Sequence, residues 1–135
     1  MDIVLDANVL FRTLISSGSI LDIIFHQSLH IYAPQQLKVE FLAHQQEIIK
    51  KSHLPRETVL FLTEELFKKI IFVNRTDYEI YLPKAKNLLK GHNKDEDFIA
   101  LCIAKKCKLW TYEKRLCDIG FGISTKQLSD SFTIR

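Results

Sequence analysis

Four acidic residues lie at positions from which a single fold can bring their carboxylates together: Asp6, Glu40, Asp95 and Glu113. Asp6 and Glu113 each follow a short apolar run, Asp95 opens an apolar helical stretch, and Glu40 lies within another helical stretch. An open α/β sheet binds ligands where its strands end, so acids at strand ends suggest function. Carboxylates that meet without basic partners repel one another and need a divalent cation. The sequence therefore predicts metal-dependent chemistry.

Each acid also has a purely structural interpretation. Asp6 could begin a loop, Asp95 could cap its helix, and Glu113 could supply a favourable first-turn charge to the helix that follows it. Glu40 could be a solvated helix residue, as most glutamates are. Asp97 is either a further metal ligand or a solvated first-turn acid. Only a fold that assembles these carboxylates favours the functional interpretation.

Polar neighbours of the acids are expected to support them. Asn8 could orient the Asp6 carboxylate through its side-chain amide, and Thr111 stands two residues before Glu113 at the end of a predicted strand. Basic residues flank the same segments and are candidates for phosphate contacts, although charged side chains beside a cleft are commonly just solvated. They are Arg12, Lys94, Lys114 and Arg115.

Short β-like runs alternate with longer helical patterns along the chain. The predicted strands cover residues 2–6, 30–33, 70–73, 108–111 and 122–124. The predicted helices cover residues 19–28, 35–51, 56–69, 77–89, a stretch opening at Asp95, 113–118 and 125–130. Strands separated by helices imply parallel pairing with helices on both faces, which is the α/β class. If the first and fourth strands are neighbours, Asp6 and Glu113 face one cleft at a switch point of the sheet.

The composition is that of an ordinary globular domain. With 135 residues, 47% of them hydrophobic and 26% charged, the chain favours one domain over residues 1–135. A net charge of +3 permits an anionic partner without requiring one. The three cysteines form no C-x-x-C pair and favour a reducing compartment. No secretory signal opens the chain and no apolar stretch approaches the roughly 20 residues of a membrane span, so we expect a cytoplasmic protein without membrane contact.

The segments that carry the acids resemble the motifs of PIN-domain ribonucleases. Residues 3–10, Ile-Val-Leu-Asp-Ala-Asn-Val-Leu, resemble the first motif of that family, and residues 36–40 resemble the second. Residues 95–101 and 109–114 resemble the third and fourth motifs. The resemblance runs through nearly all of the chain, up to about residue 124.

The resemblance implies a PIN-like three-layer α/β/α sandwich with a five-stranded parallel sheet in the order 3-2-1-4-5. It implies that clustered acids bind Mg²⁺ or Mn²⁺ and that the protein cleaves RNA, most often as the VapC-type toxin of a bacterial toxin–antitoxin pair. Carried over motif by motif, Asp6, Glu40 and Asp95 are the three central acids. Glu113 stands where the family more usually has aspartate, and its additional methylene favours metal binding through a water.

These assignments lead to a specific mechanism. We expect Asp6 and Asp95 to bind the metal directly and Glu40 and Glu113 to act directly or through water. The ion would polarise the scissile phosphate and lower the pKa of a bound water, which attacks in line. An antitoxin is expected to insert an apolar helix near helices 35–51 and 56–69, a region that could also form a homodimer.

Two alternatives remain open from the sequence. One is a PIN-fold binding module with impaired catalysis that interacts with a partner protein or RNA, for which Glu113 and the modest basic charge are both suitable. The other is a phosphatase with Asp6 as its nucleophile. It is disfavoured because such enzymes carry a second aspartate at the position of Asn8.

Overall fold

The computed structural model describes residues 1–16, 18–91 and 93–132. Five strands form one parallel sheet in the order β3-β2-β1-β4-β5, which confirms the predicted α/β class and strand order. The strands are β1 (Asp2–Leu5), β2 (His30–Pro34), β3 (Ile70–Val73), β4 (Lys108–Trp110) and β5 (Gly122–Ile123). The bounds of β3 match the prediction, and those of the other four strands differ from it by one residue at the carboxyl end.

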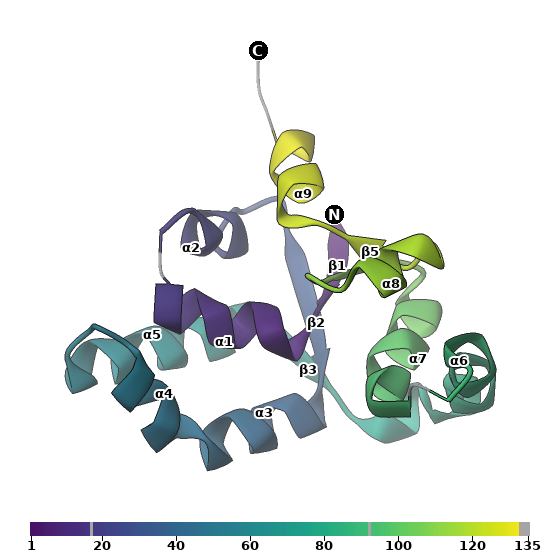
Figure 1. The fold of residues 1–135 in the computed structure, drawn as a ribbon, viewed down its shortest axis with the longest axis horizontal. Helices are drawn as coiled ribbons and strands as arrows, with labels where there is room; N and C mark the ends of the chain where they lie inside the picture. The colour runs from purple at the N-terminus through teal and green to yellow at the C-terminus, as the bar shows by residue number, and fades with distance from the viewer. Residues whose placement is uncertain (17, 92, 133–135) are drawn as a thin grey trace.

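Helices cover both faces of this sheet (Figure 1). On one side lie α1 (Ala7–Ser16), α2 (Ser19–Ile24), α3 (Gln35–Ala43), α4 (Gln45–Lys51) and α5 (Arg56–Lys69). On the other side lie α6 (Leu82–Leu89) and α7 (Glu96–Lys105). The helices α8 (Lys114–Asp118) and α9 (Thr125–Ser131) follow β4 and β5, and short 3-10 turns cover Arg75–Asp77, Glu79–Tyr81 and Asn93–Asp95.

Alternation along the central strand explains the two layers. Ile3 and Leu5 belong to a core cluster with residues of α1, α3, α4 and α5, whereas Val4 belongs to a second cluster with residues of α6 and α7. Successive side chains of a strand point to opposite faces, so a strand covered on both faces must be apolar at every position. The continuous apolar character of the strands ends at their carboxyl ends, where the polar residues of the site begin.

One helix was not predicted, and three predicted helices differ from the structure. The predicted helix 19–28 ends at Ile24, as α2. The prediction omits α1, which begins directly after Asp6 and buries Val9, Leu10 and Leu14. The predicted helix 35–51 is two helices, because the backbone leaves helical geometry at His44 (φ −104°, ψ 12°). The predicted helix 77–89 is reduced to α6, preceded by two 3-10 turns.

In the part of the chain that the structure describes, no helix has both the length and the apolar character to cross a bilayer.

Candidate active site

Asp6 directly follows the carboxyl end of β1, next to the end of the neighbouring strand β4. Its backbone N–H donates to the Trp110 carbonyl (3.0 Å) and so extends the pairing of the two strands. The residue is only 4% exposed. Thr111 Oγ1 donates a hydrogen bond of 2.6 Å to Asp6 Oδ2. Since the Thr111 N–H donates in turn to Ile123 O (3.2 Å), β5 fixes the threonine that holds the carboxylate. The predicted supporting role of Thr111 matches this geometry.

The environment of Asp6 opposes its negative charge. Burial raises the pKa of the Asp6 carboxyl above its ordinary value, and the nearby charge of Glu113 raises it further. The hydrogen bond from Thr111 and the backbone N–H groups of Ala7 and Asn8 act in the opposite direction and are together too weak to reverse the shift. The site therefore favours a cation beside this carboxylate.

Asp95 provides the second buried carboxylate, also 4% exposed. It occupies the N-cap position of α7, yet its side chain makes no capping hydrogen bond, so the capping role considered from the sequence is absent. Arg115 Nη2 donates to Asp95 Oδ2 at 3.0 Å instead. Burial raises the pKa of Asp95, the charges of Glu113 and Asp6 add to the effect, and Lys94 and Arg115 oppose it. The mutual influence of these acids shows that the fold brings Asp6, Asp95 and Glu113 to one place.

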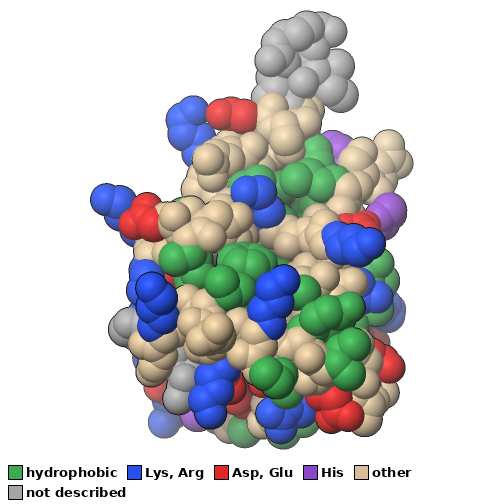
Figure 2. Space-filling view, turned by 90° about the vertical axis from the view of Figure 1, so that its right-hand side faces the viewer, with side chains coloured by type: hydrophobic (Ala, Val, Ile, Leu, Met, Phe, Trp, Pro, Cys, Tyr) green, Lys and Arg blue, Asp and Glu red, His purple; other side chains and the backbone are tan. Residues whose placement is uncertain are grey.

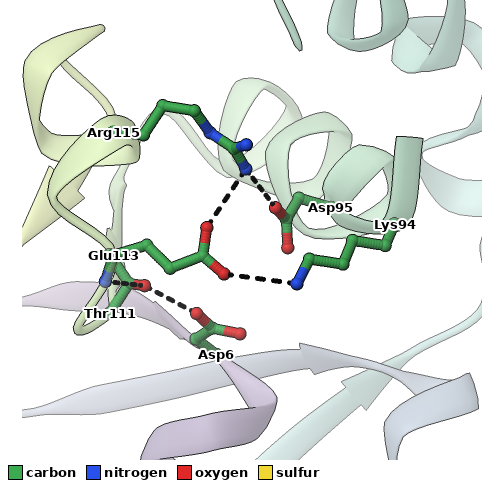
Figure 3. Close-up of polar contacts among 6 residues, drawn as sticks. All are labelled: Asp6, Lys94, Asp95, Thr111, Glu113 and Arg115. Atoms are coloured by element: carbon green, nitrogen blue, oxygen red, sulfur yellow. Dashed lines mark hydrogen bonds and ion pairs between the residues drawn. The ribbon is translucent and has the colours of Figure 1, made fainter. Parts of the chain in front are cut away.

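Glu113 lies between two cations (Figure 3). Arg115 Nη2 is 3.1 Å from its Oε2, and Lys94 Nζ is 3.8 Å from its Oε1. The backbone N–H of Glu113 donates to Thr111 Oγ1 (3.1 Å), so the same hydroxyl serves both Glu113 and Asp6. Glu113 occupies the N-cap position of α8 without a side-chain capping bond.

The basic partners are the main departure from the sequence-based expectation. Carboxylates without cationic neighbours were expected, but Arg115 bridges Asp95 and Glu113. The Arg115 Nε is buried and has no hydrogen-bond partner among the described residues. The sequence identified Arg115 and Lys94 only as candidates for phosphate contacts. The position of Arg115, two residues after the last motif acid, was the available signal for the pairing.

Glu40 and Asp97 lie together in a second acidic group. They line a pocket of about 230 Å³ with Lys94 and with apolar or amide side chains of α3, α7 and the end of β2. Glu40 is exposed, whereas Asp97 is half-buried and its Oδ2 accepts a hydrogen bond from the Tyr78 hydroxyl (2.8 Å). Arg75 Nε lies 4.0 Å from the same oxygen. Asp97 is thus half-buried and paired with Tyr78 and Arg75, and no feature of the sequence pointed to the Tyr78 contact.

Asn8 departs from its expected role. Its backbone N–H bonds to the Asp6 carboxylate, but within the described residues no hydrogen bond joins its side-chain amide to Asp6. The reason is that α1 begins at Ala7, which places the exposed Asn8 side chain on the face of the helix shared with Phe11 and Arg12.

The donor set suits a hard cation, although the described residues include no group of three acidic, histidine or cysteine side chains able to hold a metal ion. Mg²⁺ prefers oxygen ligands, keeps several waters, and is held by one or two carboxylates. Asp6 and Asp95 supply two buried carboxylates whose charges repel each other. Two carboxylates are the type and number of protein ligand by which Mg²⁺ is held, so Asp6 and Asp95 fit such an ion.

The fold and the site together define an open α/β protein with an acidic site where the strand order reverses, beside β1 and β4. Residues 4–131 match the PIN domain family, and the chain belongs to that family. Its members are generally nucleases that act on nucleic acid and typically use divalent metal ions. No curated protein matches the sequence.

Proposed function

We propose that this protein is a ribonuclease that hydrolyses RNA phosphodiester bonds with Mg²⁺ or Mn²⁺. The observation that carries the proposal is the pair of buried carboxylates, Asp6 and Asp95, whose pKa values are both raised by burial and by neighbouring acids. Such a pair destabilises the folded chain unless a cation compensates its charge. Perturbed titratable groups that share one site are typical of catalytic centres.

In this proposal Asp6 and Asp95 hold the ion, and Thr111 fixes the Asp6 carboxylate through its 2.6 Å hydrogen bond. When bound, the ion supplies Lewis-acid stabilisation of the phosphate and a water of lowered pKa as the nucleophile. Glu113 contributes through water, because its carboxylate already contacts two cations. Glu40 acts at a greater distance, from the pocket that it shares with Lys94 and Asp97.

The charge distribution supports an anionic polymer as the substrate. Figure 2 shows the face formed by the α6–α8 side of the molecule, where Lys and Arg side chains stand around exposed apolar ones. Neutralisation of phosphates by such side chains provides sequence-independent affinity for nucleic acid. The exposed lysines of this half of the chain are Lys84, Lys86, Lys90, Lys94, Lys105, Lys106, Lys108 and Lys114.

The proposal includes the role of a VapC-type toxin, because the motifs of this chain resemble those of PIN-domain ribonucleases, which are most often such toxins. The exposed apolar side chains of α3 and α5 support a partner surface for an antitoxin or a second copy of the chain. They are Val39, Leu42, Leu60 and Phe61. Induced expression should arrest growth of a bacterial host, and Asp6→Asn should abolish the arrest. Unimpaired growth with the wild-type chain would contradict the toxin role.

A binding module with impaired catalysis is the second candidate, because one observation favours it. Arg115 pairs with both Asp95 and Glu113 from within the chain and offsets part of their charge, so part of the acidic site has a cation without any metal. A module of this kind would bind RNA or a partner protein without cleaving it.

Cleavage of total RNA with and without Mn²⁺ separates the two candidates. We expect cleavage only with the ion, and we expect Asp6→Asn to abolish it. Asp22→Asn, which removes an exposed acid on α2, serves as the matched control and should cleave normally. RNA that stays intact with wild-type protein and Mn²⁺ would instead favour the binding module.

A further inference from the structure

A pocket of about 420 Å³ opens along one face of α1. Asn8, Phe11, Arg12 and Ile15 form one wall, and Tyr112 forms the other. The four α1 residues are spaced at i, i+3, i+4 and i+7, so they occupy a single face of the helix. No role in catalysis or metal binding accounts for this face of α1.

The pocket is built from the same two chain segments as the acidic site, the start of α1 and the residues after β4. Asn8 stands two residues after Asp6, and Tyr112 lies between Thr111 and Glu113. The hydrogen bonds of Asp6 to Trp110 and of Thr111 to Asp6 fix these two segments against each other. A nucleotide that presents its phosphate to the carboxylates would therefore have this pocket beside it.

The side chains of the pocket offer three kinds of contact. The Tyr112 ring is 38% exposed, although its neighbours Thr111 and Trp110 are buried. The Arg12 guanidinium carbon lies 4.6 Å from the centroid of that ring, in a cation–π arrangement. Asn8 is exposed and provides an amide donor and an amide acceptor. Planar stacking groups, a positive charge and a carboxamide together are the groups that proteins use to bind an unpaired nucleobase and its phosphate.

We propose that this pocket binds one base of the RNA strand next to the phosphate that is cleaved. The base stacks on the Arg12–Tyr112 pair, the guanidinium contacts the adjoining phosphate, and the Asn8 amide reads the edge of the base. The volume lies at the lower end of the range of ligand pockets, as a single nucleotide requires. This inference rests on the proposed ribonuclease function and adds to it a site that selects the substrate.

Binding of a short fluorescein-labelled RNA, followed by anisotropy in EDTA so that cleavage does not interfere, tests the pocket. Loss of one base–aromatic stack weakens binding by about 5- to 150-fold. We expect Tyr112→Ala and Tyr112→Leu to weaken binding to that extent, whereas Tyr112→Phe, which keeps the ring, should bind within about twofold of wild type. Phe25→Ala removes an exposed aromatic directly after α2, outside the pocket, and should have no effect.

A ribose-phosphate chain of the same length without bases sharpens the test. Wild-type protein should bind it more weakly than RNA, and Tyr112→Ala should not weaken that binding further. Equal RNA binding by Tyr112→Ala and wild type would overturn the proposal. So would an equal loss on the base-free chain, because Tyr112 would then act through the fold or through charge.

Cleavage rates with Mn²⁺, measured on the same preparations, separate a failure of the base pocket from a failure of the ribonuclease assignment. If Tyr112→Ala cleaves RNA with an unchanged KM, the base pocket is wrong and the ribonuclease assignment stands. If wild-type protein binds RNA through Tyr112 and does not cleave it, the ribonuclease assignment is wrong, and the pocket serves a module that only binds.

Discussion

Two pairs of acids lie beyond the carboxyl ends of the strands, and they differ in what surrounds them. Asp6 and Asp95 are buried, and their pKa values are raised by burial and by other acids. Glu40 is exposed, and Asp97 is half-buried with a hydrogen bond from Tyr78. The first pair carries charge that the protein does not fully compensate, whereas the second pair is stabilised by water or by its own neighbours.

The contrast within α7 is the more informative one, because Asp95 and Asp97 are only two residues apart. Both belong to the acidic start of the helix, where the helix dipole favours negative charge. Asp95 faces Arg115 and the other acids, while Asp97 faces Tyr78 and Arg75. In the proposed function, burial among like charges, and not position in the helix, is what distinguishes Asp95 as a metal ligand from Asp97.

The largest expected effect comes from exchanging one member of this neighbouring pair. Asp95→Asn should lower the Mn²⁺-dependent rate of RNA cleavage by about 10³-fold, since Lewis-acid stabilisation by the ion is worth several kcal/mol. Asp97→Asn should lower it by less than about 10-fold, because Tyr78 and Arg75 already stabilise Asp97. Initial rates under saturating Mn²⁺ measure both. Equal losses in the two variants would remove the distinction between the pairs.

A smaller effect is expected from the residue that orients Asp6. Thr111→Val preserves the shape of the side chain but removes the hydroxyl that donates to Asp6 and accepts from the Glu113 backbone. Loss of a group that positions a metal ligand costs about 10- to 100-fold in metal affinity or activity. Calorimetric titration with Mn²⁺ reports the affinity, and Thr111→Ser, which keeps the hydroxyl, should remain close to wild type. Unchanged Mn²⁺ affinity in Thr111→Val would show that the hydroxyl is dispensable.

Loss of Arg115, the cation that the chain itself supplies to the site, should change the free energy of unfolding. Arg115→Ala leaves Asp95 and Glu113 without their shared partner and should lower the free energy of unfolding by about 1–2 kcal/mol in EDTA. This is less than for a fully buried pair, because the Arg115 side chain is 37% exposed. Mn²⁺ should reduce the loss, since a bound ion would replace the missing positive charge. Urea denaturation with and without Mn²⁺ tests both statements.

Lys126→Ala provides the control for Arg115. It removes an i,i+4 ion pair with Asp130 in which both side chains are largely exposed. Such a pair contributes about 0.3–0.5 kcal/mol, and its loss should not respond to Mn²⁺. If the two variants respond alike to the ion, Arg115 does not stand in for a metal.

The alternation of strands and helices was sufficient to predict parallel pairing with helices on both faces of a sheet. The strand order 3-2-1-4-5 followed from the resemblance to PIN-domain ribonucleases and is confirmed. The two features that the sequence did not predict, the break at His44 and the helix α1, have no local sequence signal. Nothing resembling a glycine or proline breaker marks His44, where the helix 35–51 divides into α3 and α4. Asn8 and Thr13 lower the helix propensity of α1, which is stabilised by burial of Val9, Leu10 and Leu14 against the sheet.

The candidate site was only partly predictable for a related reason. The sequence identified the acids by type and by their place at element ends, and the fold brings Asp6, Asp95 and Glu113 together. It could not show that Arg115 turns back toward Asp95, because that contact depends on how α8 packs beside the start of α7. Tyr78 and Asp97 meet for the same reason, across 19 residues of chain.

The smallest expected effect is a dependence of stability on pH that arises from the buried carboxylate of Asp6. Because the folded-state pKa of Asp6 lies above the ordinary value of 3.8 for this carboxyl, the folded chain binds this proton more tightly than the unfolded chain does. Ionisation of Asp6 therefore destabilises the fold. The penalty is fully present at pH values above the raised pKa and disappears as the pH falls toward 3.8.

Asp6→Asn removes this titration while its amide oxygen can still accept the Thr111 hydrogen bond. In EDTA at neutral pH the variant should have a Tm about 2–4 °C above that of wild type, and the difference should shrink as the pH is lowered through the raised pKa of Asp6. Glu40→Gln, at an exposed acid of the second pair, is the matched control. Thermal denaturation of the three proteins between acidic and neutral pH measures it. A Tm difference for Asp6→Asn that is constant with pH would mean that the buried carboxylate is not strained by its charge, and the contrast between the two pairs would then rest on geometry alone.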